Sequence, residues 1–157
     1  MSIYSGQAAV AFDRVKGEAD WEGWRNILLR RPNTLLSFTA VKKTLNLSSA
    51  QDIGVQTIAV NDIVGSVGRY SEFSRTFKPK NRFTEQRWRR VAESYYRRGF
   101  NPVKVFKVSH VYFVIDGNHR VSVSRALNIK TICAHIYEFK TQVTLNSLDD
   151  LNSFPLN

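Results

Sequence analysis

The 157-residue sequence has a single cysteine, Cys133, and only three histidines. One cysteine forms no internal disulfide and no cysteine-based zinc site, and His110, His119 and His135 lack the spacing of metal ligands on a helix. No stretch approaches the roughly 18 consecutive apolar residues of a membrane-spanning helix. The N-terminus also lacks the basic start and apolar run of a secretory signal. We therefore expect a cytoplasmic protein with one buried core and no membrane partner.

Acidic residues are scarce as well, because 13 Asp and Glu stand against 23 Lys and Arg, for a formal charge of +10. Ten of the basic residues and only three of the acidic ones fall within residues 69–98. Such a concentration is typical of a surface that binds phosphate groups, although a solvated helix face is the alternative. Phe73, Phe77 and Phe83 lie between these basic residues, as on many nucleic-acid surfaces. The residues predicted to contact a DNA or RNA backbone are Arg75, Lys78, Lys80, Arg82, Arg87, Arg90 and Arg97.

The apolar periodicity predicts an α+β fold, with a small mixed β-sheet and helices packed on it. Residues 1–50 are expected to form an N-terminal helical extension, 51–140 the main domain and 141–157 a C-terminal tail. Gly65, Ser66 and Gly68 indicate a loop after the first strand. The predicted helices cover residues 20–31, 38–47, 84–98 and 119–127, with Thr84 as the expected cap of the third. The predicted strands cover 55–60, 131–137 and both halves of 103–115.

The segment 111–125, VYFVIDGNHRVSVSR, joins an apolar strand to a helix through a turn. Such a corner exposes backbone N–H groups at a helix N-terminus, where the helix dipole favours an anion. Gly117 permits a close approach, and Asn118 is expected to cap the helix. Arg120 in the first turn opposes the dipole unless an anion or Asp116 compensates it. The corner is therefore either an anion site or a structural turn closed by an Asp116–Arg120 pair.

The run VYFVIDGNHRVSVSRALNI followed by TICAHIYEF resembles the nucleotide-binding corner of the ParB/sulfiredoxin superfamily. That superfamily includes the N-terminal domains of ParB partition proteins, sulfiredoxin and a free-serine kinase. TIAVNDI, the helix ending in RRGFNP and VKVFKV occur upstream in the matching order, so the resemblance spans roughly residues 53–139. With its SVGRYSEF loop, the chain is most similar to bacterial ParB-like proteins that carry DGNHRVSVAR.

The resemblance implies a phosphate-binding turn and a nucleotide, ATP or CTP with Mg²⁺. Asn118 stands where sulfiredoxin has its catalytic cysteine, which excludes sulfinic acid reduction. About twenty residues follow the last strand, too few for the helix-turn-helix domain of partition proteins. Gly117, His119 and Arg120 match the phosphate-binding turn of the superfamily. From their chemistry, Asp116 and His119 are our candidate catalytic residues, and Asp116 is also the candidate magnesium ligand. The phosphate-binding candidates are Gly117, Asn118, His119, Arg120 and Ser122, with Ser66, Gly68 and Arg69 of the glycine-containing loop, for which a plain connector is the alternative.

Three functions remain open at this point. The leading one is a nucleotide-binding module with a basic surface for nucleic acid. The second is an enzyme on the same turn, a phosphotransferase or a nuclease, for which Asp62, Glu72 and Asp116 are the available acids. The third is a nucleic-acid-binding accessory protein whose corner is purely structural. For the N-terminal helices, a homodimer contact and a lid are both left open.

Overall fold

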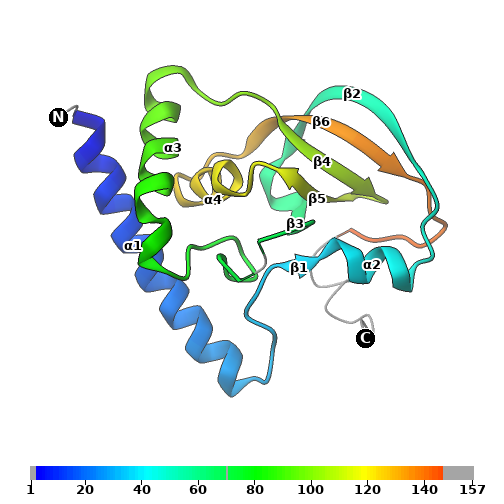
Figure 1. Ribbon diagram of the computed structural model, residues 1–157, viewed down its shortest axis with the longest axis horizontal. Coiled ribbons are helices and arrows are strands. Elements are labelled where there is room, and N and C mark those ends of the chain that lie inside the picture. The colour runs from blue at the N-terminus through cyan, green and yellow to red at the C-terminus, as the bar shows by residue number, and fades with distance from the viewer. Residues whose placement is uncertain (1–2, 70, 147–157) are drawn as a thin grey trace.

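A mixed six-stranded sheet organises the fold, and its strands run in the spatial order β1-β3-β5-β4-β6-β2. We describe residues 3–69 and 71–146 of a computed structural model (Figure 1). The β1–β3, β3–β5 and β4–β6 pairs are parallel, and the β4–β5 and β2–β6 pairs are antiparallel. The expected α+β class with a mixed sheet is thus confirmed. The strands are β1 (Leu36–Ser37), β2 (Ala50–Ala59), β3 (Ile63–Ser66), β4 (Val103–Val108), β5 (Val111–Asp116) and β6 (Thr131–Phe139).

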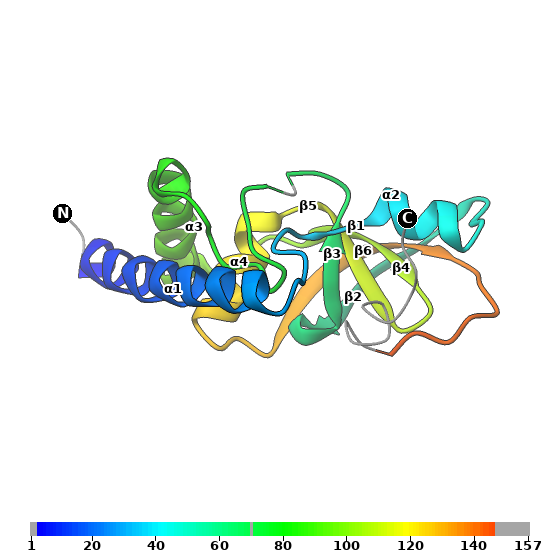
Figure 2. The ribbon, with the colours of Figure 1, turned by 90° about the horizontal axis from the view of Figure 1, so that it is seen from below.

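Helices cover the sheet from both sides, and each side has its own apolar cluster. Phe12, Trp88 and Val121 belong to the cluster beneath α1, α3 and α4, whereas Phe38 and Val41 belong to the cluster beneath α2. Figure 2 shows α2 at the far end of the molecule from α1 and α3. The helices are α1 (Ile3–Leu28), α2 (Phe38–Thr44), α3 (Glu85–Arg98) and α4 (Asn118–Ala126), with short 3₁₀ turns η1 (Val60–Asp62) and η2 (Arg82–Thr84).

The first helix begins much earlier than the sequence pattern predicted. We expected a start near Asp20, but α1 runs from Ile3 and its inner face carries Ala8, Phe12 and Val15, all at most 2% exposed. Alanines supply much of that face, so the apolar periodicity was too weak to identify it. The rings of Phe12 and Trp88 meet edge to face at 5.6 Å. Much of the expected extension therefore shares the core of the main domain.

The segment 63–66 is a strand and not the loop that its small residues suggested. Strand β3 is buried along its length, between β1 and β5. A Cβ on Gly65 would lie 2.4 Å from the Leu36 carbonyl oxygen and 2.8 Å from Cδ1 of Phe113. Glycine is needed here for a close approach of neighbouring chains and not for a turn.

The elements nearest the motif agree with the sequence, apart from one cap. The β4–β5 hairpin turns at Ser109, and α3 buries Trp88 and Ala92 and ends at Gly99 with φ +73°. Thr84 does not cap α3, because its hydroxyl donates to the Asn81 carbonyl at 3.0 Å.

The start of the predicted tail packs against the hairpin. Leu145 is fully buried, and its N–H donates to the Ser109 hydroxyl at 2.9 Å. Residues 147–157 of that tail lie outside the described part of the chain. Among the described residues, no helix has both the length and the apolar character needed to cross a bilayer.

Candidate anion-binding site

Parallel pairing of β3 with β5 brings the glycine loop and the motif corner together. Gly65 aligns with Phe113 and Ser66 with Val114, so the two strands end side by side. The Val67 N–H donates to the Val114 carbonyl at 2.9 Å, which extends the pairing beyond β3. The chain leaving β3 and the turn leaving β5 therefore share one edge of the sheet, the edge at which α/β folds commonly bind ligands.

The turn itself requires glycine and leaves the start of α4 uncapped. Gly117 has φ +123°, and a Cβ there would lie 2.6 Å from Cγ1 of Val103. The first hydrogen bond of α4 joins the Val121 N–H to the Gly117 carbonyl at 3.0 Å. The N–H groups of residues 118–120 thus have no acceptor within the helix. No side chain caps this end, and no acidic residue lies in its first turn.

Asn118 connects the two turns and does not cap its own helix as we expected. Its amide nitrogen donates to the Gly68 carbonyl at 3.2 Å, and its oxygen lies 2.9 Å from the Ser66 hydroxyl. Ser66 is 1% exposed and also lies 2.9 Å from the Gly68 carbonyl. The side chains of Ser66 and Asn118, both predicted phosphate ligands, instead fix the loop against the corner. Gly68 remains at the opening, where its backbone lines the site.

Arg120 is held by the protein in a way that the sequence did not reveal. Its guanidinium donates to the carbonyls of Asn101 and Pro102 at 3.0 and 2.9 Å, and lies 3.3 Å from a carboxylate oxygen of Asp116. The structural pairing of Asp116 with Arg120 is therefore present. We predicted that Arg120 would contact phosphate. In the structure its guanidinium instead links α4 to the chain that enters β4.

A hollow of about 270 Å³ lies over the uncapped end of α4. The two turns form one wall, and Arg87 and Val91 of α3 contribute to another. Arg87 makes no hydrogen bond or ion pair with the described residues, whereas Arg69 bonds Glu72 at 3.0 Å. We predicted Arg87 for a nucleic-acid surface, and the structure places it at the corner. Its exposed, unpaired guanidinium faces this space together with the free N–H groups of α4.

His119 lines the same hollow but is nearly buried, with 6% of its surface exposed. Burial, and then the nearby charges of Arg87 and Arg69, lower the pKa of His119 from 6.5 to about 4. The imidazole is neutral at pH 7, so the 4.0 Å between its Nε2 and a carboxylate oxygen of Glu72 is not an ion pair, and it is too long for a hydrogen bond. Its Nδ1 has no hydrogen-bond partner in the described part of the chain. A neutral ring can offer one N–H to a ligand but is a poor general acid at neutral pH.

A second hollow, of about 480 Å³, adjoins the first because Val91 and Arg120 line both. Ser94 and Arg98 of α3 and Phe100 after it contribute to its walls. Arg87, Val91, Ser94 and Arg98 follow the i, i+4, i+7, i+11 spacing of one helix face. We did not assign Arg98 or Phe100 to the site from sequence, although this spacing is the signal that identifies them. Both hollows lie against α3, and we refer to the two together as the α3 groove.

Two predicted roles are not supported by the geometry. Ser122 is 1% exposed and its hydroxyl accepts from Nε1 of Trp88 at 2.9 Å, so it lies outside the hollow at the corner. Asp116, the candidate magnesium ligand, is paired with Arg120 and has no acidic cluster around it. Within residues 3–69 and 71–146, no group of three His, Cys, Asp or Glu side chains could hold a metal ion.

The predicted nucleic-acid residues divide into two groups. Lys78 binds the buried Glu22 at 3.0 Å, Arg82 bonds Asp13 and Glu85, and burial lowers the pKa of Arg75. Phe73 and Phe77 are core residues, with at most 1% exposed, while Phe83 is exposed. These residues mainly fix the segment 69–84 to the core. The side chains without a hydrogen bond or ion pair to the described residues are those of the half-buried Arg75 and of Lys80, Arg87, Arg90 and Arg97.

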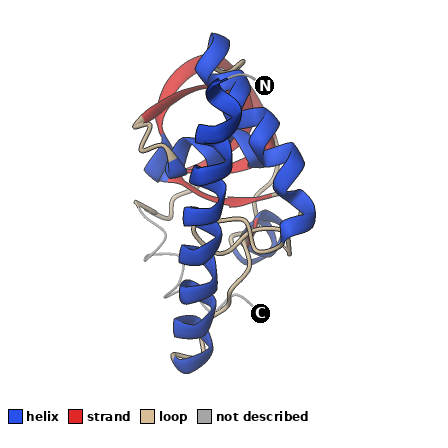
Figure 3. Cartoon of the chain, turned by 90° about the vertical axis from the view of Figure 1, so that its left-hand side faces the viewer, coloured by secondary structure: helices blue, strands red, loops and turns tan. Residues whose placement is uncertain are grey.

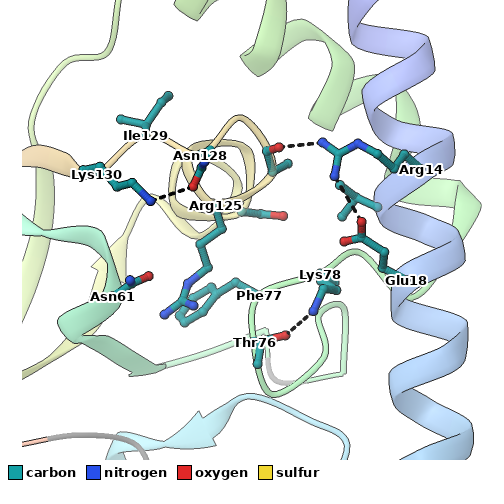
Figure 4. A pocket seen from close by; sticks show the side chains of 13 residues that line it. Arg14, Glu18, Asn61, Thr76, Phe77, Lys78, Arg125, Asn128, Ile129 and Lys130 are labelled. Atoms are coloured by element: carbon teal, nitrogen blue, oxygen red, sulfur yellow. Dashed lines mark hydrogen bonds and ion pairs between the residues drawn. The ribbon is translucent and has the colours of Figure 1, made fainter.

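Another cavity, of about 290 Å³, lies on the other side of α4 (Figure 4). The basic side chains in its wall all bond to the protein. Arg14 donates to the Ala126 carbonyl, Lys130 to Asn128, and Arg125 to the Ile63 carbonyl while it lies over the Phe77 ring. These contacts hold α4 against α1 and β3, so this cavity is a weaker candidate for an anion than the corner.

In comparisons with known proteins, the chain matched no protein-family model, no curated protein and no solved structure.

The buried neutral His119 should make folding stability depend on pH. Its folded pKa of about 4 lies below the 6.5 of an exposed histidine, so the unfolded chain binds a proton that the folded chain does not between these values. Stability is then complete above about pH 6.5 and falls as the pH drops towards 4, by about 2 kcal/mol at pH 4.5. Urea unfolding at pH 7 and pH 4.5 measures this loss. Between these two pH values, the unfolding free energy of the His119→Gln variant should fall by about 2 kcal/mol less than that of the wild type. Equal losses in the two proteins would show that His119 is not buried and neutral.

Proposed function

We propose that the protein is a nucleotide-binding module of the ParB/sulfiredoxin kind, whose ligand places its phosphates at the corner after β5. The observation that carries this proposal is the uncapped N-terminus of α4, which has no acidic residue in its first turn and opens into a hollow that Arg87 also lines with an unpaired guanidinium. Free N–H groups, a positive helix end and an unpaired arginine all favour an anion with several oxygens.

Each part of the corner has a distinct role in this proposal. The backbone N–H groups of residues 118–120 bind a phosphate, and Arg87 supplies the positive charge across from them. His119 donates a single N–H as a neutral ring. Arg120 positions the first turn of α4 through its bonds to Asn101 and Pro102 and does not itself contact the ligand. Asn118 keeps the backbone of Gly68 at the edge of the hollow.

The shape of the groove suggests where the rest of a nucleotide lies. From the corner, the space continues along α3 to Arg98 and Phe100. An aromatic ring and a guanidinium are the groups on which a base stacks. We therefore place the phosphates at Gly117–Arg120 and the nucleoside towards Phe100.

The chemistry of the site favours binding over catalysis. Phosphoryl transfer needs a carboxylate free to orient a nucleophile or hold a metal ion. Asp116 is paired with Arg120 and Glu72 with Arg69. Asp62 lies in η1 and does not line the hollow. In this proposal Mg²⁺ arrives with the nucleotide and is not held by a protein cluster.

A nucleotide titration with a matched pair of arginine variants tests the proposal. Isothermal titration with ATP, CTP and GTP, each with Mg²⁺, should give heat with at least one of them. Arg87→Ala should weaken binding roughly tenfold or more, because a charge-assisted hydrogen bond contributes about 1.5–3 kcal/mol. Arg90→Ala is the control, since Arg90 lies on the same helix but does not line the hollow. The absence of heat with all three nucleotides, or equal effects of the two variants, would contradict the proposal.

We also propose that the exposed face of α3 binds a nucleic-acid backbone through Arg90 and Arg97. Fluorescence anisotropy with a DNA duplex, repeated over a range of salt, should show affinity that falls steeply with salt. Each arginine-to-alanine change should lower the slope by about one and act equally on different sequences. Lys43→Ala, on α2 at the far end of the molecule, is the control (Figure 2). A slope that the arginine variants leave unchanged would remove this surface from the proposal.

A further inference from the structure

The outer face of α1 is apolar although nothing in the described structure covers it. Trp21, Trp24 and Leu28 are 71%, 67% and 77% exposed, and Ile3 and Val10 are 77% and 71% exposed. Large apolar side chains gathered on one face of a soluble protein usually mark an interaction surface.

These residues form one continuous line along the helix, opposite its buried side. The steps along the helix from Ile3 to Val10, Trp21, Trp24 and Leu28 are 7, 11, 3 and 4 residues. Such steps place the five side chains on one face of a helix. Gly6 and Gly17 lie on the same line, and a Cβ on either would meet no atom within 4 Å. Figure 3 shows α1 nearest the viewer along its length, with no other element in front of it. The line is therefore accessible from end to end.

We infer that this face is a dimer interface and that its partner is α1 of a second copy of the chain, packed antiparallel about a two-fold axis. We place the two-fold axis across the helix between residues 13 and 14. Two residues that face each other then have numbers that add up to 27. Trp21 and Val10 then each face a glycine across the interface, and Trp24 faces an isoleucine. The pairs are Ile3 with Trp24, Gly6 with Trp21, Val10 with Gly17, and Asp13 with Arg14.

Both size and charge support a second copy as the occupant. Trp21 and Val10 each meet a glycine of the other chain, Gly6 and Gly17, which lets the helix axes approach closely there. At the two-fold axis, Asp13 of each chain faces Arg14 of the other. Asp13 already pairs with Arg82 and Arg14 with Glu18 in the same chain, but their side chains are 63% and 50% exposed and can still meet the opposite charge of a second copy. An isologous interface must be self-complementary, and the part of this line between Ile3 and Trp24 is; Leu28 lies beyond the paired part.

The area available is adequate for a specific interface. Two tryptophans offer roughly 300 Å² on each chain, and the aliphatic residues add about as much again. With the polar edges of a 26-residue helix, the total approaches the roughly 800 Å² per partner of a specific interface. This inference does not depend on the proposed nucleotide site, because α1 contributes nothing to the hollow at the corner.

Mass measurement of the full chain tests the interface. Light scattering after size exclusion should give the mass of a dimer for the wild type. Trp21→Lys combined with Trp24→Lys should halve that mass while circular dichroism stays unchanged. Val55→Lys is the matched control, because Val55 is 57% exposed and belongs to β2, a strand that Figure 1 shows across the molecule from α1. A monomeric wild type, or a dimer that survives the double lysine change, would overturn the inference.

Disulfide trapping tests the register independently of those substitutions. Cys133→Ser removes the native thiol, and Val10→Cys with Gly17→Cys then places two thiols opposite each other across the two-fold axis. Residues seven apart on one helix lie about 10 Å apart, too far for an internal bridge. Oxidation should give a covalent dimer. Gly6→Cys with Gly17→Cys is the register control and should stay monomeric under denaturing conditions. Equal trapping of both pairs, or of neither, would contradict this pairing.

Discussion

The parallel pairing of β3 with β5 is the constraint on which the rest of the structure depends. It sets Ser66 beside Val114, and so brings the loop at Gly68 against the turn at Gly117. Asn118 then joins the two turns, and Gly65 keeps β1 and β5 close enough to bury β3. Without that register, the uncapped end of α4 would have no second turn beside it, and Arg87 would face open solvent.

The arginines of this protein have two different uses, which their burial and partners separate. Arg120 and Arg125 bind backbone carbonyls and fix α4 at both of its sides. Arg87 and Arg90 have no ion-pair partner among the described residues and lie on an exposed helix face. The net charge of +10 therefore overstates the surface available to phosphates, because several of its charges stabilise the fold.

The sequence predicted elements with strong periodicity, and tertiary contacts decided the rest. The stripe of Trp88 and Ala92 identified α3, whereas the alanine-rich face of α1 and the small residues of β3 gave no comparable signal. The motif located the corner correctly, since Gly117 needs its positive φ. It offered the Asp116–Arg120 pair as one alternative, but it could not show that Arg120 also binds two backbone carbonyls. Nor could it show that Ser122 lies on the Trp88 side of α4 or that Arg87 reaches the hollow, because these depend on how helices pack.

The titration of His119 by NMR, with and without a nucleoside triphosphate, tests the central claim most directly. The positive charges of Arg87 and Arg69 and the burial of the ring hold its pKa at about 4 in the free protein. A phosphate bound at the corner would offset those charges, so we expect the pKa of His119 to rise by about one unit or more on binding. A triphosphate that binds without changing this pKa would show that its phosphates lie elsewhere, and would contradict the account.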